Sequence, residues 1–126
     1  MNESLKVMKE PAEGKEHISI LHLNGSLDAQ GEETLLAYAH DAFEEGARFV
    51  LLDLAEVNIL TSAGMRAMHK VYKMFTPEKD MYKISHVKLC RAPQDLYQTL
   101  GVTGFLQNIQ SYETMQEALD SFSNVS

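Results

Sequence analysis

Two hydroxyl side chains, those of Thr61 and Ser62, stand where an apolar run gives way to an amphipathic segment. From Met65 onward the apolar residues recur at helical spacing, which predicts a helix over residues 62–75. A hydroxyl residue at a helix start can cap the free backbone N–H groups. An exposed hydroxyl at the same place can instead accept a phosphate, since the positive end of a helix accommodates negative charge. This pattern alone leaves both roles open.

The sequence has no motif for a metal site or a nucleotide-binding loop. No two of the five histidines lie three or four residues apart on a predicted helix, and His-Glu-x-x-His and paired cysteines are absent. The seven glycines occur singly, so no glycine-rich loop follows a strand to cradle a polyphosphate. We therefore expect no metal and no cofactor, and we expect any ATP that matters to this protein to be bound by another chain.

Covalent catalysis is also poorly supported by the residues. Ser62 lacks the Gly-x-Ser-x-Gly pattern of a nucleophile elbow, and Cys90 ends a predicted strand with no base nearby in sequence, as expected of a small core residue. An acid–base pair could come from two of the carboxylates of Asp28, Asp53 and Glu56. However, Asp28 more simply caps a helix, and Asp53 ends a buried strand. An enzyme would need a pocket that gathers Asp28, Asp53 and a histidine. We expect no catalytic residue.

The net charge of −7, from 18 acidic and 11 basic residues, restricts the class of partner. Phosphate contacts need clustered Lys and Arg, so a nucleic-acid surface is disfavoured, as is an anionic membrane. The N-terminus has no apolar signal segment, and no stretch approaches the roughly 20 apolar residues of a membrane span. The single cysteine allows no disulfide framework. We expect a soluble cytoplasmic protein with no nucleic-acid or membrane partner.

Segments with strand patterns alternate along the chain with segments of helical spacing. Strands are expected at residues 5–9, 17–23, 49–54, 83–90 and 106–109, and helices at 29–45, 62–75, 93–100 and 113–122. The strand at 49–54 is expected to be buried on both faces and to be followed by an acidic loop, and Asp28 is the expected N-cap of the first helix. The alternation predicts an α/β fold, with a mixed sheet of four to five strands and about four helices in a single domain over residues 1–126.

Three segments, in order along the chain, resemble the motifs of the STAS domain of bacterial anti-sigma factor antagonists. The first is a buried strand and polar loop leading into Thr61-Ser-Ala-Gly-Met-Arg-Ala-Met68. The second is the turn between strand and first helix, Leu23-Asn-Gly-Ser-Leu-Asp28. The third is a strand, Val87-Lys-Leu-Cys90, and a short helix that ends in Leu100-Gly-Val-Thr-Gly-Phe105. The resemblance covers residues 17–122 and implies a single-domain STAS fold.

The resemblance also implies a function, which is partner switching. In that family an unmodified antagonist binds an anti-sigma factor, often a serine kinase with its own ATP site. The kinase phosphorylates one serine of the antagonist, which then releases its partner, and a metal-dependent serine phosphatase resets the cycle. By motif position the phosphorylated residue is Ser62, with Thr61 as the second choice. The implied partner-binding residues are Ser26, Asp28, Asn58, Thr61, Ser62, Gly64 and Arg66.

The sequence departs from the family pattern in two places. Thr61 stands where many members have an acidic residue or a serine, and the connector at residues 76–82 is longer and less glycine-rich than usual. The alternative function is a STAS interaction module in a sensory or transport assembly that is never phosphorylated, in which Ser62 only caps the helix. Incubation with a cognate kinase and ATP, followed by intact mass, distinguishes the two.

Overall fold

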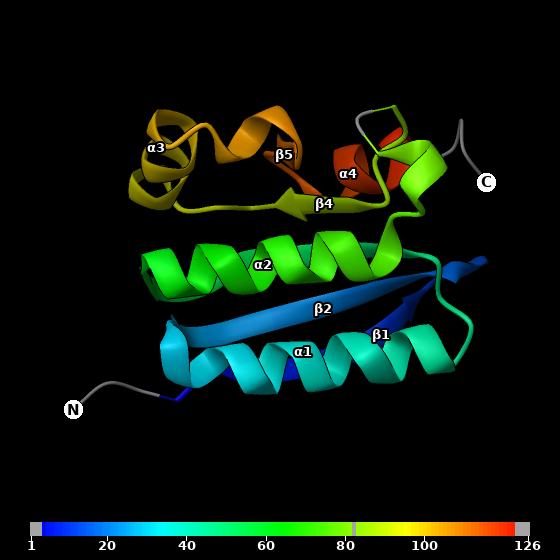
Figure 1. Ribbon diagram of the computed structural model, residues 1–126, viewed down its shortest axis with the longest axis horizontal. Helices are drawn as coiled ribbons and strands as arrows, with labels where there is room; N and C mark the ends of the chain where they lie inside the picture. The colour runs from blue at the N-terminus through cyan, green and yellow to red at the C-terminus, as the bar shows by residue number, and fades with distance from the viewer. Residues whose placement is uncertain (1–3, 82, 123–126) are drawn as a thin grey trace.

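The computed structural model describes residues 4–81 and 83–122, which form one mixed sheet with helices on both faces (Figure 1). The strands are β1 (Lys6–Ala12), β2 (Lys15–Leu27), β3 (Phe49–Leu60), β4 (Val87–Cys90) and β5 (Ser111–Tyr112). The helices are α1 (Ala29–Glu44), α2 (Ser62–Phe75), α3 (Gln94–Val102) and α4 (Met115–Ser121), with short 3₁₀ turns η1 (Glu78–Asp80) and η2 (Phe105–Gln107). The predicted α/β class is confirmed.

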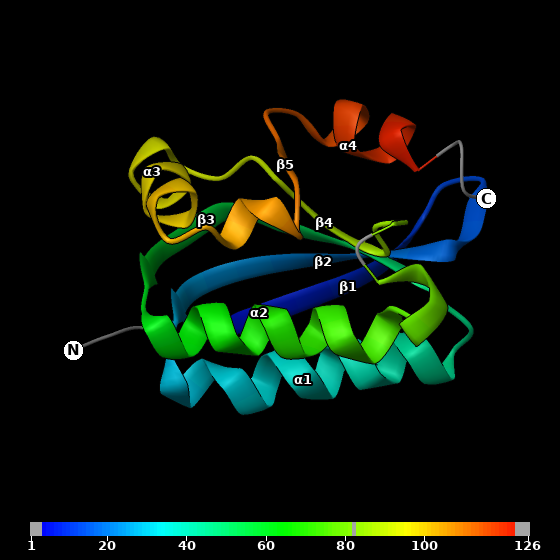
Figure 2. The same ribbon diagram turned by 45° about the horizontal axis from the view of Figure 1, so that its top comes forward.

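The strands lie in the order β1-β2-β3-β4-β5, so each strand pairs with its neighbour in sequence. β1 runs antiparallel to β2, and the other three pairings are parallel. Parallel neighbours need a crossover connection, which α1 supplies between β2 and β3 and α2 supplies between β3 and β4. Figure 2 shows α1 and α2 together on one face of the sheet and α4 on the other.

The centre of the sheet is buried on both faces, as predicted for residues 49–54. Val50, Leu52 and Leu54 point into the larger core beneath α1 and α2, whereas Phe49 and Leu51 join a smaller cluster beneath α4. This alternation follows from the period of two along a strand. Covering both faces explains why residues 49–54 of β3 are apolar except for Asp53.

Three strands are longer than predicted. β2 continues beyond residue 23 to Leu27, and β3 continues through the residues expected to form an acidic loop, 55–60. The two extensions pair with each other, with Asn24 opposite Glu56 and Leu27 opposite Leu60, across two shifts in register. Pairing of backbone groups between the strands therefore outweighs the polar composition of these segments. β1 likewise runs on to Ala12.

The C-terminal third departs furthest from the predicted boundaries. The strand expected at 83–90 begins only at Val87, because the backbone N–H groups of Lys83 and Ile84 bond back to the carbonyl of Asp80 in a turn. The strand expected at 106–109 is absent from the described residues, where η2 and Ile109 fill that place, and β5 follows at 111–112. α3 extends past Gly101 to Val102, and α4 begins at Met115.

Candidate functional site

The helix start at residues 61–64 assigns separate roles to the two hydroxyl residues. Thr61 has extended backbone angles and is the N-cap of α2, where its Oγ1 accepts a hydrogen bond of 3.2 Å from the N–H of Gly64. Ser62 is the first residue of the helix, and its side chain is exposed. The idea that Ser62 caps the helix is therefore wrong, since Thr61 does so. The hydroxyl of Ser62 therefore lies at the positive end of a 14-residue helix and is not needed as its cap.

Gly64 fixes where this helix start lies. A Cβ atom placed on Gly64 would lie 2.0 Å from the carbonyl oxygen of Leu27 and 2.7 Å from its carbonyl carbon, so only glycine fits. The same carbonyl oxygen accepts a hydrogen bond of 3.1 Å from the N–H of Thr61. The first turn of α2 is thus in direct backbone contact with the end of β2.

The predicted partner-binding residues gather at one end of the molecule, where α1 and α2 both begin (Figure 1). Asp28 is the N-cap of α1 as predicted, and its Oδ1 accepts a 3.0 Å hydrogen bond from the N–H of Gly31. Asn58 is exposed on the extension of β3. Ser26 differs, because its side chain is buried, and its Oγ has no hydrogen-bond partner among the described residues. Ser26 therefore lies beneath this surface.

Arg66 lies one helical turn beyond Ser62 and is exposed. Ser62 and Arg66 line the same groove along α2, which has a volume of about 530 Å³. The structure therefore brings together on the surface the residues Asp28, Asn58, Thr61, Ser62 and Arg66, with Gly64 and Ser26 beneath them.

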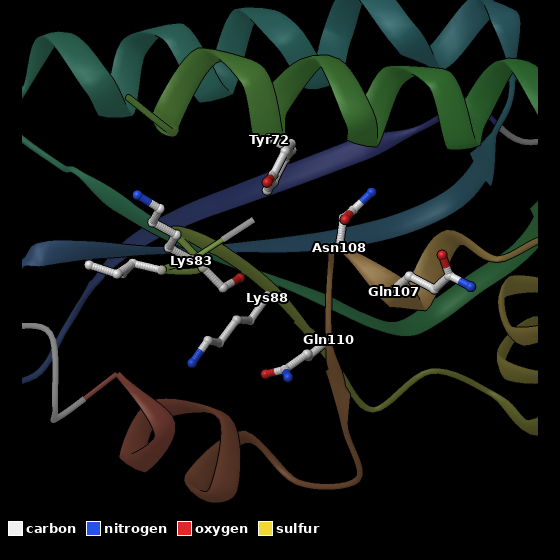
Figure 3. Close-up of a pocket in the computed structure, with 8 residues that line it drawn as sticks. Tyr72, Lys83, Lys88, Gln107, Asn108 and Gln110 are labelled. Carbon is white, nitrogen blue, oxygen red and sulfur yellow. The ribbon is translucent and has the colours of Figure 1, made fainter. Parts of the chain in front are cut away.

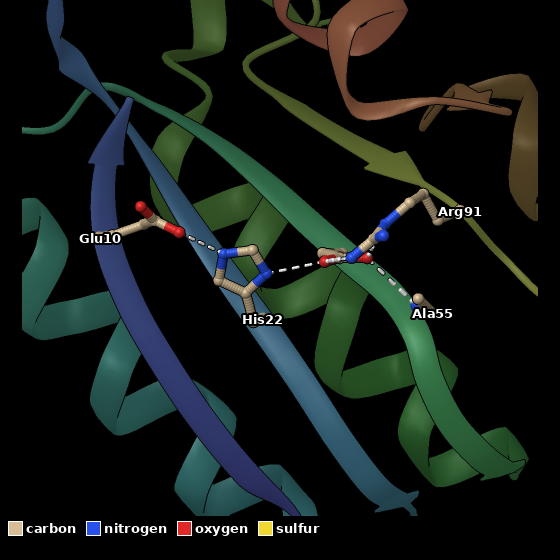
Figure 4. A network of polar contacts seen from close by, with 5 residues as sticks. Glu10, His22, Ala55 and Arg91 are labelled. Carbon is tan, nitrogen blue, oxygen red and sulfur yellow. Dashed lines mark hydrogen bonds and ion pairs between the residues drawn. The ribbon is translucent and has the colours of Figure 1, made fainter. Parts of the chain in front are cut away.

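A network of charged side chains on the α4 face of the sheet was not expected from the sequence (Figure 4). His22 lies between two carboxylates, with Nδ1 2.7 Å from Asp53 and Nε2 2.5 Å from Glu10. Asp53 also accepts two hydrogen bonds from Arg91, at 3.1 and 2.6 Å, and one from the N–H of Ala55. Asp53 lies inside β3 and does not end the strand, because β3 continues to residue 60.

The only sequence signal for this network is a polar residue within each of two apolar strands. Their contact depends on register, since His22 pairs with Asp53 and Asp53 with Cys90 across the parallel strands. Register between distant strands is set by the packed sheet, and the local pattern does not specify it.

The network shifts the pKa values of its members. Burial raises the pKa of Asp53, but the hydrogen bonds from Arg91, His22 and the Ala55 N–H outweigh it, so the pKa ends below its ordinary value. Burial likewise lowers the pKa of His22, but hydrogen bonding and charge attraction to Asp53 and Glu10 raise it above 6.5. The two carboxylates therefore favour the charged form of His22.

We predict that His22 makes stability depend on pH. Because its pKa is higher in the folded state than in the unfolded state, its contribution is full below about pH 6.5 and is lost as pH rises through the folded value. The unfolding free energy of the wild-type protein should fall over that range, and the fall should be smaller in His22→Gln. Urea titrations from about pH 5 to about pH 9 measure this. Equal pH dependence in both proteins would contradict the prediction.

The acid–base pair weighed in the sequence analysis is not assembled in the described residues. Asp28 follows the end of β2 and lies six residues after His22, the partner of Asp53. Six residues of extended chain span about 20 Å, so Asp28 and Asp53 do not share a pocket with a histidine. Burial raises the pKa of the Cys90 thiol to about 12, which keeps it protonated. In residues 4–81 and 83–122, no cluster of three or more His, Cys, Asp or Glu side chains could hold a metal ion.

A separate polar pocket of about 390 Å³ opens at the edge of the sheet beside β4 (Figure 3). Tyr72 of α2 lies on one side of it and Gln110 on the other, with Lys88 between. The Nζ of Lys88 donates hydrogen bonds to the carbonyl oxygen and Oγ of Ser121 in α4. Tyr72 lies ten residues along α2 from Ser62, or about 15 Å, so this pocket is distinct from the helix start.

Residues 11–118 match the STAS domain family, and the chain belongs to that family. The fold is that of known anti-sigma factor antagonists. One from Mycobacterium paratuberculosis has 17% sequence identity and a TM-score of 0.74, covering 94% of this chain and 93% of the other. SpoIIAA in its unphosphorylated form has 15% identity and a TM-score of 0.72, covering 96% and 99%.

A third structure is the Bacillus cell fate determinant SpoIIAA in its phosphorylated form. It has 15% identity and a TM-score of 0.65, covering 92% of this chain and 98% of the other. No match is found among curated protein sequences. Among the helices of the described residues, none is both long enough and apolar enough to cross a bilayer.

Proposed function

We propose that this protein is a cytoplasmic, non-catalytic anti-sigma factor antagonist that binds an anti-sigma factor until Ser62 is phosphorylated. The observation that carries the proposal is the exposed hydroxyl of Ser62 at the first position of α2, beside a cap that Thr61 already supplies. The similarity to SpoIIAA, a structure of which is phosphorylated, supports it.

The partner is an anti-sigma factor that is itself a serine kinase with its own ATP site. Within the complex, the γ-phosphoryl group of ATP is transferred to the Oγ of Ser62, the hydroxyl proton passes to a base of the kinase, and ADP leaves. A metal-dependent serine phosphatase restores the hydroxyl by hydrolysis, with release of inorganic phosphate. This chain supplies only the acceptor and its position.

The helix start suits a modification that changes binding without unfolding the domain. A phosphate on Ser62 adds about −1.5 to −2 charge near free backbone N–H groups and the positive end of the helix dipole. The cap is unaffected, because it depends on Thr61 and Gly64. The cost of the phosphate therefore arises in the complex, where a dianion loses its water and meets the partner surface.

We expect phosphorylation of Ser62 to weaken binding of the anti-sigma factor about a hundredfold, which corresponds to about 2.7 kcal/mol. The unfolding free energy should change by less than about 1 kcal/mol. Titration calorimetry with the anti-sigma factor encoded in the same genome measures the first effect, and urea denaturation measures the second. The proposal fails if phosphorylated and unmodified protein bind with equal affinity.

Variants of the two hydroxyl residues identify the acceptor. Ser62→Ala should abolish the added phosphate mass after incubation with kinase and ATP. Thr61→Asn removes the other hydroxyl but keeps a good N-cap residue, so it should still accept one phosphate. If no phosphate is added to the wild type and Ser62→Asp binds normally, the alternative remains, which is a STAS interaction module that is not phosphorylated.

A further inference from the structure

A groove runs along α2 from Ser62 toward the other end of the helix. One wall is the exposed face of α2, and the other is the turn between α3 and η2, which lies beside α2 in Figure 2. The two walls touch where the Oγ1 of Thr103 lies 3.7 Å from the sulfur of Met65. The lining residues are Ser62, Met65, Arg66, His69, Lys70, Lys73, Thr103, Gly104 and Phe105.

The groove is positively charged although the protein as a whole is negatively charged. It is lined by one arginine and two lysines and by no carboxylate, whereas the chain carries a net charge of −7. Arg66 and Lys73 lie seven residues apart on the same face of α2, a span of about 10 Å. Their spacing matches two carboxylates about two helical turns apart on a bound segment.

The groove also has apolar contact surface between its charges. Met65 and Phe105 are partly buried against the main core and also line the groove. The ring of His69 stacks on Tyr72, and Lys70 is paired with Glu32 of α1, so these two side chains are held by the protein itself. Among the ion pairs of the described residues, none involves Arg66 or Lys73. A ligand with acidic groups on either side of an apolar side chain complements this surface.

We propose that this groove binds an acidic amphipathic segment of the protein partner, with carboxylates on Arg66 and Lys73 and an apolar side chain over Met65 and Phe105. Regulation of this groove rests on the proposed function, because Ser62, the proposed phosphate acceptor, lies at one end of it. A phosphate on Ser62 is one helical turn from Arg66 and competes with the segment for that guanidinium. Phosphorylation thereby removes a binding group as well as adding repulsion.

A peptide tests the groove without the natural partner. The probe is a 14-residue amphipathic helix with Glu on one face and Leu and Phe on the other, and the control peptide has Lys in place of Glu. In ¹H–¹⁵N spectra the acidic peptide should shift the amides of α2 and of residues 103–105, and the basic peptide should not. Shifts elsewhere, or equal effects of the two peptides, overturn the proposal.

Charge variants give the matched comparison. Arg66→Gln with Lys73→Gln should weaken binding of the acidic peptide about tenfold. The control removes two charges from exposed lysines outside the groove, Lys6→Gln with Lys79→Gln, and should change affinity less than twofold. Equal effects of the two double variants would show a nonspecific charge effect and overturn the proposal.

Phosphorylated protein separates this inference from the proposed function. If the peptide binds in the groove but phosphorylation of Ser62 leaves anti-sigma factor affinity unchanged, the docking surface stands and the switch fails. If phosphorylation releases the anti-sigma factor but the groove variants bind it normally, the switch stands and the docking surface fails. If the amide resonances of the groove residues shift with protein concentration when no peptide is present, a second copy of this chain binds in the groove. That result would overturn the proposal.

Discussion

Replacing Gly64 with alanine is expected to lower the free energy of unfolding by about 3 kcal/mol or more. The added methyl group would lie 2.0 Å from the carbonyl oxygen of Leu27, and a backbone atom cannot rotate away as a side chain can. Relief requires α2 to move from the end of β2, which would break the bond from the Thr61 N–H to the same carbonyl. Urea denaturation of the wild type and the variant measures the loss.

Gly101 provides the matched control. It is exposed within α3, and a Cβ there meets nothing within 4 Å. Since alanine is the better helix former, Gly101→Ala should raise stability by about 0.5 to 1 kcal/mol. If the two variants change the free energy of unfolding in opposite directions, the close approach of the Leu27 carbonyl is what requires glycine at position 64. If Gly64→Ala were as harmless as Gly101→Ala, the position of the α2 start would need another explanation.

The same contact links stability to the proposed switch. Ser62 occupies its exposed position because Gly64 lets the first turn of α2 touch the end of β2. A displaced helix start would move the hydroxyl relative to Asp28 and Asn58 on the same surface. We therefore expect Gly64→Ala to be a poor substrate for the kinase even where it remains folded.

The features predicted well from sequence are those that depend on local pattern. The bounds of α2 agree with the prediction because the apolar period changes from strand to helix at Ser62 and Pro77 prevents continuation. The cap at Asp28 also depends on chemistry within one helical turn. Residues 49–54 were recognisable as a buried strand because both faces of the sheet are covered.

The features that were missed depend on partners far away in sequence. Residues 55–60 read as a loop, yet they form strand because the end of β2 provides backbone partners for them. The choice between Thr61 and Ser62 as cap depends on a one-residue shift in where the helix begins, which composition does not resolve. The contact between His22 and Asp53 needs the register of two strands 31 residues apart.

Arg91→Ala is expected to lower the free energy of unfolding by about 2 to 3 kcal/mol. Asp53 is 3% exposed, and removing Arg91 leaves its carboxylate with only His22 and the Ala55 N–H as partners. Breaking a fully buried ion pair costs about 3 to 5 kcal/mol, and the value here is smaller because the arginine side chain is 48% exposed. Urea denaturation at neutral pH measures the loss.

Two variants distinguish the contribution of the Arg91 side chain to stability from the cost of its backbone conformation. Arg91 has a φ of +57°, a left-handed angle that costs a residue other than glycine roughly 1 kcal/mol. Arg91→Gly loses the same ion pair as Arg91→Ala but relieves this strain, so it should be about 1 kcal/mol more stable than the alanine variant. Equal stabilities would mean that the left-handed angle carries no cost in this protein.

Acid titration supplies the independent check of the ion pair. The lowered pKa of Asp53 gives stability that is present above the unfolded value of about 3.8 and is lost as pH falls through the folded value. Without Arg91 the pKa of Asp53 should rise, so Arg91→Ala should lose less stability on acidification than the wild type. If both proteins lose the same free energy between neutral and acidic pH, the arginine does not lower the pKa of Asp53. The cost of Arg91→Ala would then arise from packing alone.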